Sequence, residues 1–422
     1  MKNGRLLRWS LCFLFMLLCI ASAHAEVALD EAHFPDMDFR EYLSGYDRDG
    51  NGVLGDEELR SVTYIMMLSG QHPQLASLQG VEYLTELKSL ILSSKRDLVS
   101  VDLSRNTKLE ELQLDLCGLT ELDVSQNTAL RTLNCEANKL TELDVSMCPS
   151  LEKLMCRGNQ LSSLRLGENR NLTSLSFYSN PTLKKLDISG CRNLTEIIGG
   201  SCGLTEFSLI GCDHLRKVEL GGNQITYLDL GGTFNYTLEE LNVNYLKLGE
   251  LDVSEFGNLR RLECLGGQLT ALTVPGRLEE LVCGTNLFES LDVSACERLT
   301  KLYCTLSKLT SLDLSHNTRL EKLDLTYSAN LKYLDVHTNT ALKELKLQGC
   351  ALACMDVTGL GSLNTFYCDY NRQTVSFTDG VFNTGLLPGF SPSCAHDFEG
   401  GTMEGGELRL NEGSSQISYT YE

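Results

Sequence analysis

The chain has 422 residues, of which 56 are acidic and 36 are Lys or Arg, giving a formal net charge of −20. So large a negative excess argues against nucleic acid and anionic bilayers as partners, and it suits solubility and cation binding. The length alone suggests two or three globular domains, but an internal repeat indicates one elongated domain over most of the chain.

Residues 1–25 have the three regions of a secretory signal peptide. A basic start is followed by an apolar run from Leu11 to Ile20 and by the small-x-small cleavage site Ala23-His24-Ala25. The alternative, a membrane anchor, is disfavoured because the apolar run is short. We therefore expect an exported mature chain, secreted or associated with the cell surface, without membrane insertion.

Residues 26–75 are predicted to form a small helical N-terminal cap around a loop with EF-hand spacing. The loop runs from Asp47 to Glu58 and has Gly52 where an EF-hand turns sharply. Its oxygen ligands predict one bound calcium ion. The predicted ligands are Asp47, Asp49, Asn51, the carbonyl of Val53, a water at Gly55 and the bidentate Glu58. The alternative is an acidic helix cap without metal. Since only one such loop is present, calcium affinity is expected to be in the weak extracellular range.

From Leu84 to Asn371 one pattern recurs every 21 or 22 residues, apart from one interval of 23 and one of 19. Its clearest copy is LRTLNCEANKL, the cysteine half, followed by TELDVSMCPS, the aspartate half. The period and the LxxLxLxxNxL frame are typical of leucine-rich repeats. Residues 76–373 are therefore predicted to form a solenoid of the α/β type, a largely β horseshoe of about fourteen coils. The first inward residues of the cysteine halves are Leu90, Leu112, Leu133, Leu154, Leu175, Ile197, Val218, Leu241, Leu262, Leu281, Leu302, Leu323, Leu345 and Phe366.

Alternation within each half predicts a short strand. In LxL the two leucines point inward and the middle residue faces solvent, so stacked coils share one core. Asparagines five places after the first inward residue are expected to hydrogen-bond the backbone of the bend. These asparagines are Asn138, Asn159, Asn223, Asn286 and Asn371.

The cysteines that follow the signal peptide fall into register with the repeat, except Cys354 and Cys394. Stacked strands hold equivalent side chains about 4.8 Å apart and parallel, whereas a disulfide needs Cβ atoms about 3.8 Å apart. Although disulfides are the usual default in exported proteins, we expect buried free thiols. Zinc is less favoured because no CxxC pair exists. The second inward place holds Cys135, Cys156, Cys264, Cys283, Cys304 and Cys368, and the bends hold Cys117, Cys148, Cys191, Cys202, Cys212, Cys296 and Cys350.

These repeats resemble those of the cysteine-ladder internalins, for example in LNCEANKLTELDVSMCPSL and LYCTLSKLTSLDLSHNTRL. The lead-in FPDMDFREYL (Phe34 to Leu43), followed by an EF-hand-like loop, is similar to secreted leucine-rich repeat proteins of gut bacteria. The resemblance covers almost all of the mature chain. It implies an exported bacterial binding protein with protein or glycoconjugate partners. Many coils depart from the cysteine ladder, with Leu114, Phe177, Leu220 or Val243 at the ladder place.

The two halves differ in their solvent-facing strand residue. In the aspartate half it is Asp in most coils, for example Asp292 and Asp313, whereas in the cysteine half it differs from coil to coil. A varied face can encode a partner, so the cysteine half is assigned to the concave sheet and to ligand binding. The predicted contact residues are Tyr303, Tyr327, Tyr367 and Tyr370. The alternative is scattered surface tyrosines.

Residues 374–422 leave the repeat and are predicted to form a C-terminal β cap. Two alternating runs, ELRL (Glu407 to Leu410) and QISYTYE (Gln416 to Glu422), suggest a hairpin over the last coil.

No sequence motif of the common catalytic classes is present, so an enzyme is not expected. The favoured function is an adhesin-like binding protein that recognises an extracellular protein or glycoconjugate through its concave face. The alternative is a calcium-stabilised structural or assembly component of the cell envelope without a dedicated ligand.

Overall fold

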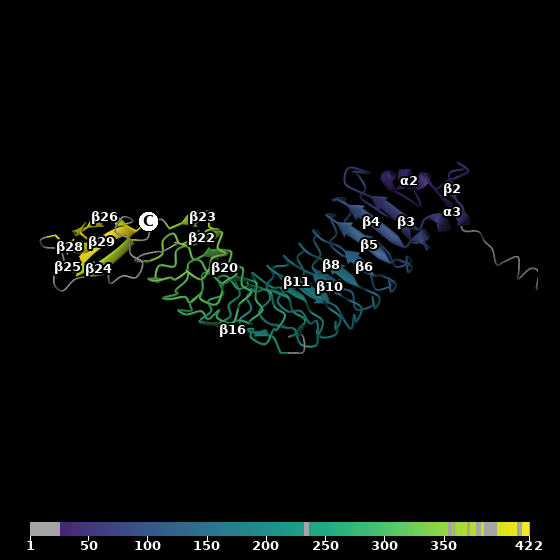
Figure 1. Ribbon diagram of the computed structural model, residues 1–422. Helices are drawn as coiled ribbons and strands as arrows, with labels where there is room; N and C mark the ends of the chain where they lie inside the picture. The colour runs from purple at the N-terminus through teal and green to yellow at the C-terminus, as the bar shows by residue number, and fades with distance from the viewer. Residues whose placement is uncertain are drawn as a thin grey trace, which may run out of the picture. The chain divides into compact units, whose positions relative to one another are not determined.

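The computed structural model describes residues 26–231, 236–352, 357, 359–368, 372–376, 381–383, 395–411 and 416–421 (Figure 1). The chain divides into two compact units, residues 1–151 and 152–422, which are described separately. The predicted signal peptide lies outside the described residues. Within the described part of the chain, no helix is both long and apolar enough to cross a membrane.

The N-terminal cap consists of two short helices that flank the predicted calcium loop. Helix α2 (Met37–Ser44) begins after Asp36, whose carboxylate accepts the backbone N–H of Phe39 at 3.1 Å. Helix α3 (Asp56–Ser61) has three acidic residues in its first turn, where they favour the positive end of the helix dipole. The loop between the helices contains β2 (Val53–Leu54), which pairs antiparallel with β1 (Val27–Ala28).

The FPDMDFREYL segment forms the core of this cap. The rings of Phe34 and Phe39 meet edge to face with centroids 5.9 Å apart, and both side chains are fully buried. Phe34 lies so close to Gly80 that a Cβ atom at residue 80 would overlap its ring. The second carboxylate oxygen of Asp36 accepts the N–H groups of Ala76 and Ser77, at 2.8 and 3.1 Å. One segment therefore starts a helix, fills the core and holds the loop that leads into the first coil.

The cap also supplies a strand to the repeat sheet, which the sequence did not predict. Strand β3 (Tyr64–Met67) pairs in parallel with β4 (Ser89–Ser93). Beyond β3, the hydroxyl of Tyr42 accepts the N–H of Met66 at 3.2 Å, and the hydroxyl of Tyr46 donates to the carbonyl of Tyr64 at 3.1 Å. Tyr42 of helix α2 and Tyr46 just after it thus satisfy backbone groups at a strand edge that would otherwise invite pairing with another chain.

The cysteine halves form parallel strands as predicted. In the first unit, β4, β5 (Glu111–Asp115) and β6 (Thr132–Asn134) follow β3 in chain order. In the second unit the ladder continues from coil to coil in the same register, and Figure 1 shows these strands side by side. Its strands are β8 (Lys153–Met155), β10 (Ser174–Ser176), β11 (Glu196–Ile198), β13 (Lys217–Glu219), β15 (Glu240–Asn242), β17 (Arg261–Glu263), β19 (Glu280–Val282), β20 (Lys301–Tyr303), β21 (Lys322–Asp324), β22 (Glu344–Lys346) and β23 (Thr365–Tyr367).

Each predicted inward residue lies in one of these strands and is buried, except Phe366. Phe366 is 36 % exposed because β23 is the last strand of the ladder. Volume changes in the core are matched between neighbouring coils. Phe177 occupies a ladder place, and Gly199 takes the same place in the next coil, where a Cβ atom would overlap the Phe177 ring.

The aspartate halves form fewer strands than predicted. Six short strands occur among the described coils, and the other aspartate halves are turns. The six are β7 (Glu142–Asp144), β9 (Ser163–Arg165), β12 (Phe207–Ser208), β14 (Leu228–Asp229), β16 (Glu250–Asp252) and β18 (Ala271–Thr273). The repeated aspartate accepts the N–H two residues on both in halves that form strands, as at Asp144 and Asp252, and in halves that form turns, so this bond does not decide between them. This bond measures 2.9 Å at both Asp292 and Asp313.

Asparagines at the bends hydrogen-bond the backbone, as predicted for the cysteine halves. Asn286, for example, accepts the N–H of Leu269 at 3.0 Å and donates to the carbonyls of Cys264 and Cys283, both at 2.8 Å. Asn138, Asn159 and Asn223 also donate to carbonyls of the bend, and Asn371 lies outside the described residues.

Bends of the aspartate halves use only the donor end of the amide. Asn317 donates to the carbonyls of Val293 and Cys296, both at 2.9 Å, while its buried carbonyl oxygen has no hydrogen-bond partner. Asn106, Asn127 and Asn339 have the same orphan oxygen. A position that needs a donor and no acceptor also suits a thiol, and Cys296 points its Sγ at the carbonyl of Pro275, 3.4 Å away. This explains why either Asn or Cys can occupy these bends.

The cysteines of the described residues are free thiols, and all but Cys368 are buried. This confirms the prediction of buried free thiols for twelve of the thirteen described cysteines; Cys354 and Cys394 lie outside the described residues. Burial raises the pKa of the Cys135 thiol to about 12 and that of Cys148 to about 11. Because the thiolate is the reactive form, these cysteines act as apolar filling rather than as nucleophiles.

The C-terminal cap is β structure, but its pairing differs from the predicted hairpin. ELRL and QISYTY are strands β28 (Glu407–Leu410) and β29 (Gln416–Tyr421), yet they belong to different sheets. Strand β28 pairs with β25 (Val381–Asn383) and β27 (Gly401–Glu404), and β29 pairs with β24 (Arg372–Ser376) and β26 (Ala395–Glu399). Gly405 and Gly406 both have a positive φ and form a tight turn that joins β27 directly to β28. Strand β28 therefore pairs with β27 rather than with β29.

Candidate calcium loop and binding face

The predicted calcium loop brings its carboxylates together. Asp47, Asp49 and Glu58 each offer an oxygen, and these oxygens lie within 4.8 Å of one another. Gly52 has a φ of 79°, the left-handed conformation that the sharp turn requires. Asn51 and the carbonyl of Val53 lie on the same loop, and the N–H of Gly55 donates to Glu58 at 2.9 Å. Every predicted ligand is therefore present on one tight turn.

Hydrogen bonds within the loop hold these ligands in position. Asp47 accepts the N–H groups of Gly50 and Gly52, at 2.9 and 2.8 Å, and Glu58 accepts that of Arg48 at 2.7 Å. Among the described residues, no Lys, Arg or His forms an ion pair with the three carboxylates at 47, 49 and 58. The arrangement leaves concentrated negative charge on hard oxygen donors, and the donor set fits calcium.

The loop is single, and a strand of the same chain supports it. Val53 and Leu54 of β2 face Ala28 and Val27 of β1, and Leu29 donates to the carbonyl of Gly52 at 2.9 Å. In paired EF-hands a second loop supplies the strand partner. Here strand β1, near the N-terminus of the described chain, takes that place.

The candidate binding face is the solvent-facing side of the parallel strands, here called the sheet face. It consists of the residues on either side of each inward residue, and most of them are half-buried because neighbouring coils crowd them. Tyr303 ends β20 and Tyr367 ends β23, so both belong to this face. Asp324 and Lys346 stand between them in the register. The two rings are therefore three strands apart, about 14 Å along the sheet.

Tyr327 occupies a different place, the fourth residue after the inward residue, here called the rim position. Its ring is 56 % exposed. Leu306, on the adjacent coil, holds the same position and is also 56 % exposed. Tyr303, Leu306 and Tyr327 thus lie on the neighbouring coils of β20 and β21, with Tyr367 further along and Tyr370 outside the described residues.

All rim positions from β4 to β22 have a positive φ, which the sequence did not reveal. Only four of them are glycine, and the residues are Ser94, Leu116, Ala137, Gly158, Ser179, Ser201, Gly222, Tyr245, Gly266, Thr285, Leu306, Tyr327 and Gly349. The φ of Leu306 is 52° and that of Tyr327 is 61°. A left-handed conformation costs a residue with a side chain about 1–2 kcal/mol. Bulky residues are rare there.

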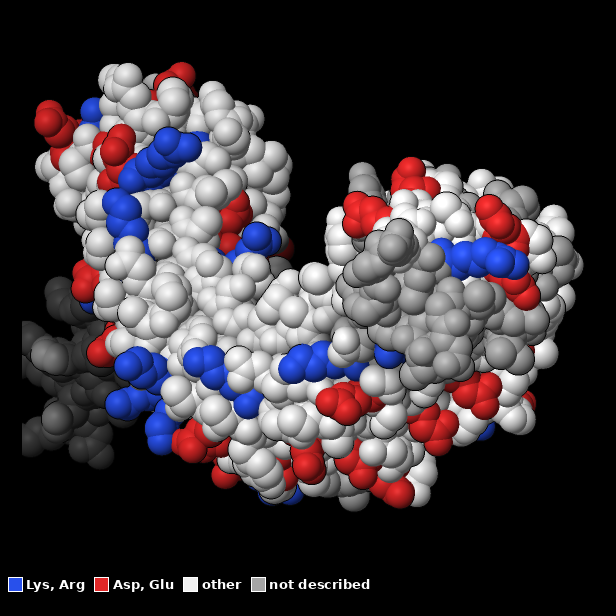
Figure 2. All heavy atoms as spheres, turned by 90° about the vertical axis from the view of Figure 1, so that its left-hand side faces the viewer, with Lys and Arg blue, Asp and Glu red and all other residues white. Residues whose placement is uncertain are grey.

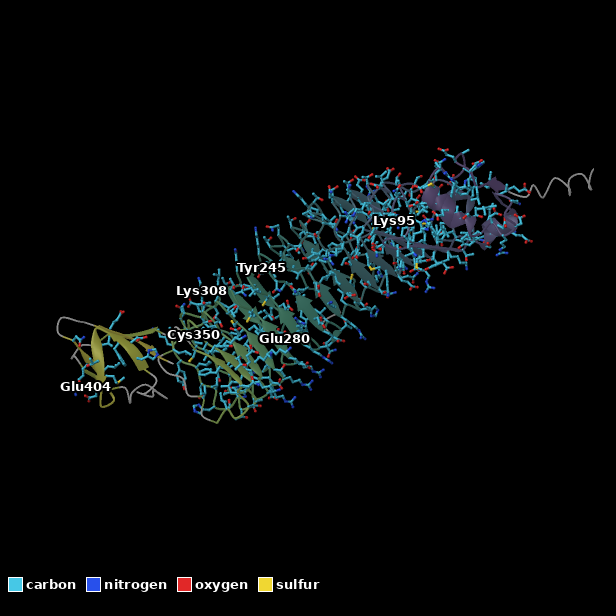
Figure 3. All side chains as sticks on the ribbon, turned by 90° about the horizontal axis from the view of Figure 1, so that it is seen from above. Lys95, Tyr245, Glu280, Lys308, Cys350 and Glu404 are labelled. Atoms are coloured by element: carbon cyan, nitrogen blue, oxygen red, sulfur yellow. The ribbon has the colours of Figure 1, made fainter. Side chains whose placement is uncertain are left out.

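Two of the rim tyrosines rest on glycine of the following coil. A Cβ atom on Gly349 would lie 2.5 Å from the ring of Tyr327, and one on Gly266 would lie 2.7 Å from the ring of Tyr245. Tyr245 is 59 % exposed, and Figure 3 marks it together with Glu280 of β19. The sequence analysis missed Tyr245 and Leu306, because only the positive φ singles out these positions. Each tyrosine ring is held on one side and open to solvent on the other.

Charges on the sheet face of β17 to β22 balance, although the whole chain is strongly acidic. Four basic residues, Arg261, Lys301, Lys322 and Lys346, stand beside four acidic ones, Glu263, Glu280, Asp324 and Glu344. They form ion pairs between neighbouring strands, such as Lys301 with Glu280 at 3.1 Å and Lys322 with Glu344 at 3.0 Å. Acidic and basic side chains both occur, separated by uncharged ones, on the face drawn in Figure 2.

On the aspartate half, the repeated carboxylates have a structural role. Hydrogen bonds from the residue two places on lower the pKa of Asp102, Asp187, Asp292, Asp313 and Asp335. Each of these carboxylates already accepts a backbone N–H and faces solvent. A regular row of turn-forming side chains carries no partner-specific pattern, in contrast to the sheet face.

These features define a leucine-rich repeat fold: a stack of coils of mostly 21 or 22 residues, a parallel sheet of LxL strands and asparagine bends. A family described as "Leucine Rich repeat" matches residues 179–195 and 305–321. No curated protein sequence matches the chain.

Among solved structures, the chain is similar to a cysteine-ladder internalin. The functional domain of InlJ from Listeria monocytogenes, which includes a cysteine ladder, shares 29% identity at a TM-score of 0.67. The match covers 85% of this chain and 74% of that one. The internalin InlF from Listeria monocytogenes has 18% identity, a TM-score of 0.57 and coverage of 81% and 97%. YopM, a leucine-rich effector protein from Yersinia pestis, has 20% identity, a TM-score of 0.58 and coverage of 79% and 89%. The last two likenesses concern the fold alone.

Proposed function

We propose that this chain is an exported, adhesin-like bacterial binding protein that recognises an extracellular protein or glycoconjugate through its sheet face and rim. The observation that carries the proposal is the presence of large, exposed apolar side chains at strained rim positions. Calcium at Asp47 to Glu58 is proposed to stabilise the N-terminal cap and to take no part in recognition.

The rim residues are hard to explain by folding. Leu306 and Tyr327 are each more than half exposed, so their side chains bury little apolar area. Their backbone lies in a region that glycine enters freely, and the chain does use glycine at four other rim positions. Strain that folding does not repay points to another use of the side chain, and aromatic and aliphatic anchors are the usual centre of an interface.

The support under the tyrosine rings is consistent with this role. Tyr245 and Tyr327 are each held against a glycine of the next coil, so little side-chain freedom remains to be lost on binding. The balanced charges of the sheet face also mean that an acidic chain need not repel an acidic partner there. Contact energy would then come mainly from the apolar rim, and the salt dependence of binding should be weak.

The test is a screen of the mature protein, residues 26–422, against purified host surface proteins, mucins and bacterial or host polysaccharides. The probe is the immobilised parent protein, and the matched comparison is a variant with Leu306→Gly and Tyr327→Gly. Saturable binding of one class that the variant loses is the expected result. If the parent binds none of these classes and instead self-associates with calcium, the chain is a structural or assembly component of the envelope and the proposal is wrong.

A further inference from the structure

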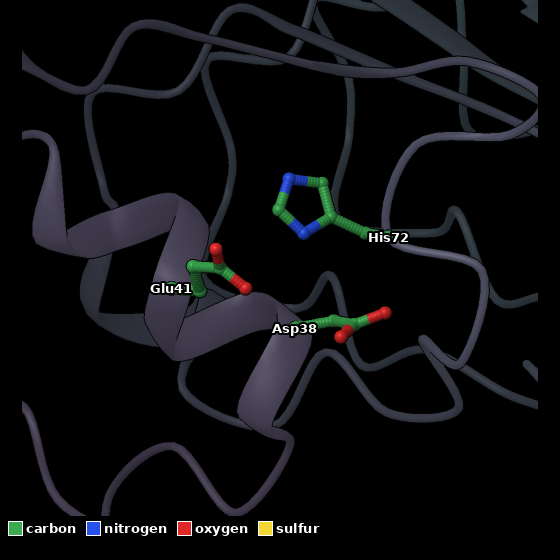
Figure 4. A group of neighbouring side chains, drawn as sticks. All are labelled: Asp38, Glu41 and His72. Atoms are coloured by element: carbon green, nitrogen blue, oxygen red, sulfur yellow. The ribbon is translucent and has the colours of Figure 1, made fainter.

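Three side chains with metal-binding atoms meet on the N-terminal cap, away from the calcium loop. Asp38 and Glu41 lie one turn apart on helix α2, and His72 comes from the loop after β3. A ligand atom from each lies within 4.8 Å of the other two. Figure 4 shows the imidazole of His72 beside the two carboxylates of the helix. Sequence reasoning did not find this group, because His72 follows Glu41 by 31 positions and Asp38 by 34.

Hydrogen bonding leaves the three groups free to take a ligand. Asp38 is only 8 % exposed, and one of its oxygens accepts the N–H of Gln74 at 3.0 Å. Its other oxygen accepts no hydrogen bond from the described residues, and neither ring nitrogen of His72 makes one. The unused oxygen of this nearly buried carboxylate is therefore available to a cation.

The surroundings fix the two inner groups and leave the third mobile. His72 has a φ of 43° and precedes Pro73, and its ring meets that of Tyr42 edge to face at 6.0 Å. Lys95 lies near and interacts favourably with Asp38, but its ammonium donates to the carbonyls of Leu68 and Gln71 rather than to the carboxylate. Glu41 is exposed, so its side chain can swing inward.

We propose that Asp38, Glu41 and His72 form a second cation site on the cap, selective for a divalent transition metal such as zinc. An imidazole nitrogen with two carboxylates is a donor set that zinc binds well, whereas calcium prefers oxygen alone. Tetrahedral zinc needs its ligand atoms about 3.3 Å apart, given bonds of about 2.0 Å. The ligand atoms must therefore move closer together on binding, which the exposed side chain of Glu41 can do by rotation, and water would complete the coordination.

The two cation sites would then act on different contacts of the cap. Calcium at Asp47 to Glu58 fixes the loop between α2 and α3. Zinc joins α2 to the loop of residues 68–77, which already hydrogen-bonds to Asp36 and Asp38 and carries the carbonyls that hold Lys95. The second site therefore fastens the helical cap to the first coils of the sheet.

Zinc titration of the metal-free mature protein in millimolar calcium tests the proposal, read by calorimetry and by the melting temperature. The variants are His72→Asn and Glu41→Gln. Asparagine tolerates the positive φ of residue 72, so the first variant removes the imidazole without adding backbone strain. The matched control is His33→Asn, because His33 is also a cap histidine beside an aspartate but is already hydrogen-bonded to Asp30 at 2.8 Å.

The expected result is one zinc per chain, a melting temperature raised by zinc, and affinity reduced about tenfold or more in both variants but unchanged in the control. Calcium binding should be the same in all of them, and Glu58→Gln should weaken calcium without affecting zinc. Zinc binding that survives His72→Asn and Glu41→Gln, or that disappears with Glu58→Gln, would overturn the proposal. So would the absence of any zinc heat in the folded parent protein.

Discussion

The rim positions allow a direct test of whether their large side chains serve folding or binding. The perturbation is the replacement of Leu306 or Tyr327 by glycine. Each change relieves a left-handed backbone that costs about 1–2 kcal/mol, and it adds about 0.5–1 kcal/mol of unfolded-state entropy. Since each side chain is 56 % exposed, the apolar contact that is lost is small. The entropy cost and the small loss of apolar contact offset much of the relieved strain, so the free energy of unfolding should change by less than about 1 kcal/mol.

The assay is urea unfolding of the parent and of each variant, followed by circular dichroism. The matched control is Leu347→Ala, because Leu347 is fully buried in the neighbouring coil of β22. Truncation of a buried leucine costs about 2–5 kcal/mol, so this control should unfold at clearly lower urea. If the glycine variants lose as much stability as Leu347→Ala, the rim side chains are structural and the argument for a binding role fails.

Three further predictions concern the metal, the thiols and the bends. Calcium at 100 times its Kd should stabilise the mature protein by about 2.7 kcal/mol, and Glu58→Gln should abolish most of this gain; no heat on calorimetric titration with millimolar calcium would contradict it. In the native protein few thiols should react with a thiol reagent at pH 8, since burial raises their pKa values. The denatured mature protein should titrate close to fifteen thiols; several disulfides on mass mapping would refute this. Asn317→Asp should lower stability by about 3 kcal/mol or more, because a carboxylate would face two carbonyls, whereas Asn317→Cys should cost about 1 kcal/mol; equal losses would show that the position does not require a donor.

Periodicity made the sheet predictable from the sequence. Each inward residue from Leu90 to Phe366 lies in a parallel strand, because one coil can bury its leucines only by stacking in register on the next. Strand β3 was missed, since YIMM lies in the cap and lacks the repeat frame. Strands in the aspartate halves were overpredicted. The LxL alternation is the same in both halves, and the aspartate carboxylate accepts the backbone N–H two residues on in strands and turns alike, so neither feature separates the two.

Less of the candidate sites could be predicted. The calcium ligands are local in sequence, so their spacing alone indicates that they converge. The rim could not be seen, because Leu306 and Tyr327 look like ordinary loop residues until their backbone conformation is known. The tyrosines at 303 and 367 were correctly placed on strands of one face, yet the register puts Asp324 and Lys346 between them. The charge pattern along the face depends on which residues are neighbours in adjacent coils. The repeat period alone does not show this until the strands are aligned in register.

The most direct test of the account is the affinity of the partner for variants on the two faces, measured by surface plasmon resonance. Tyr303→Ala, Tyr327→Ala and Tyr367→Ala alter the sheet face and rim, while Asp292→Asn and Asp313→Asn alter the other half and keep an oxygen for the turn. If the tyrosines form the interface, the change at Tyr327 should weaken binding by about 2 kcal/mol, roughly thirtyfold, and the aspartate changes by less than about 0.5 kcal/mol. Affinity that survives the three tyrosine changes but falls with the aspartates would place the binding site on the opposite side of the solenoid and contradict the account.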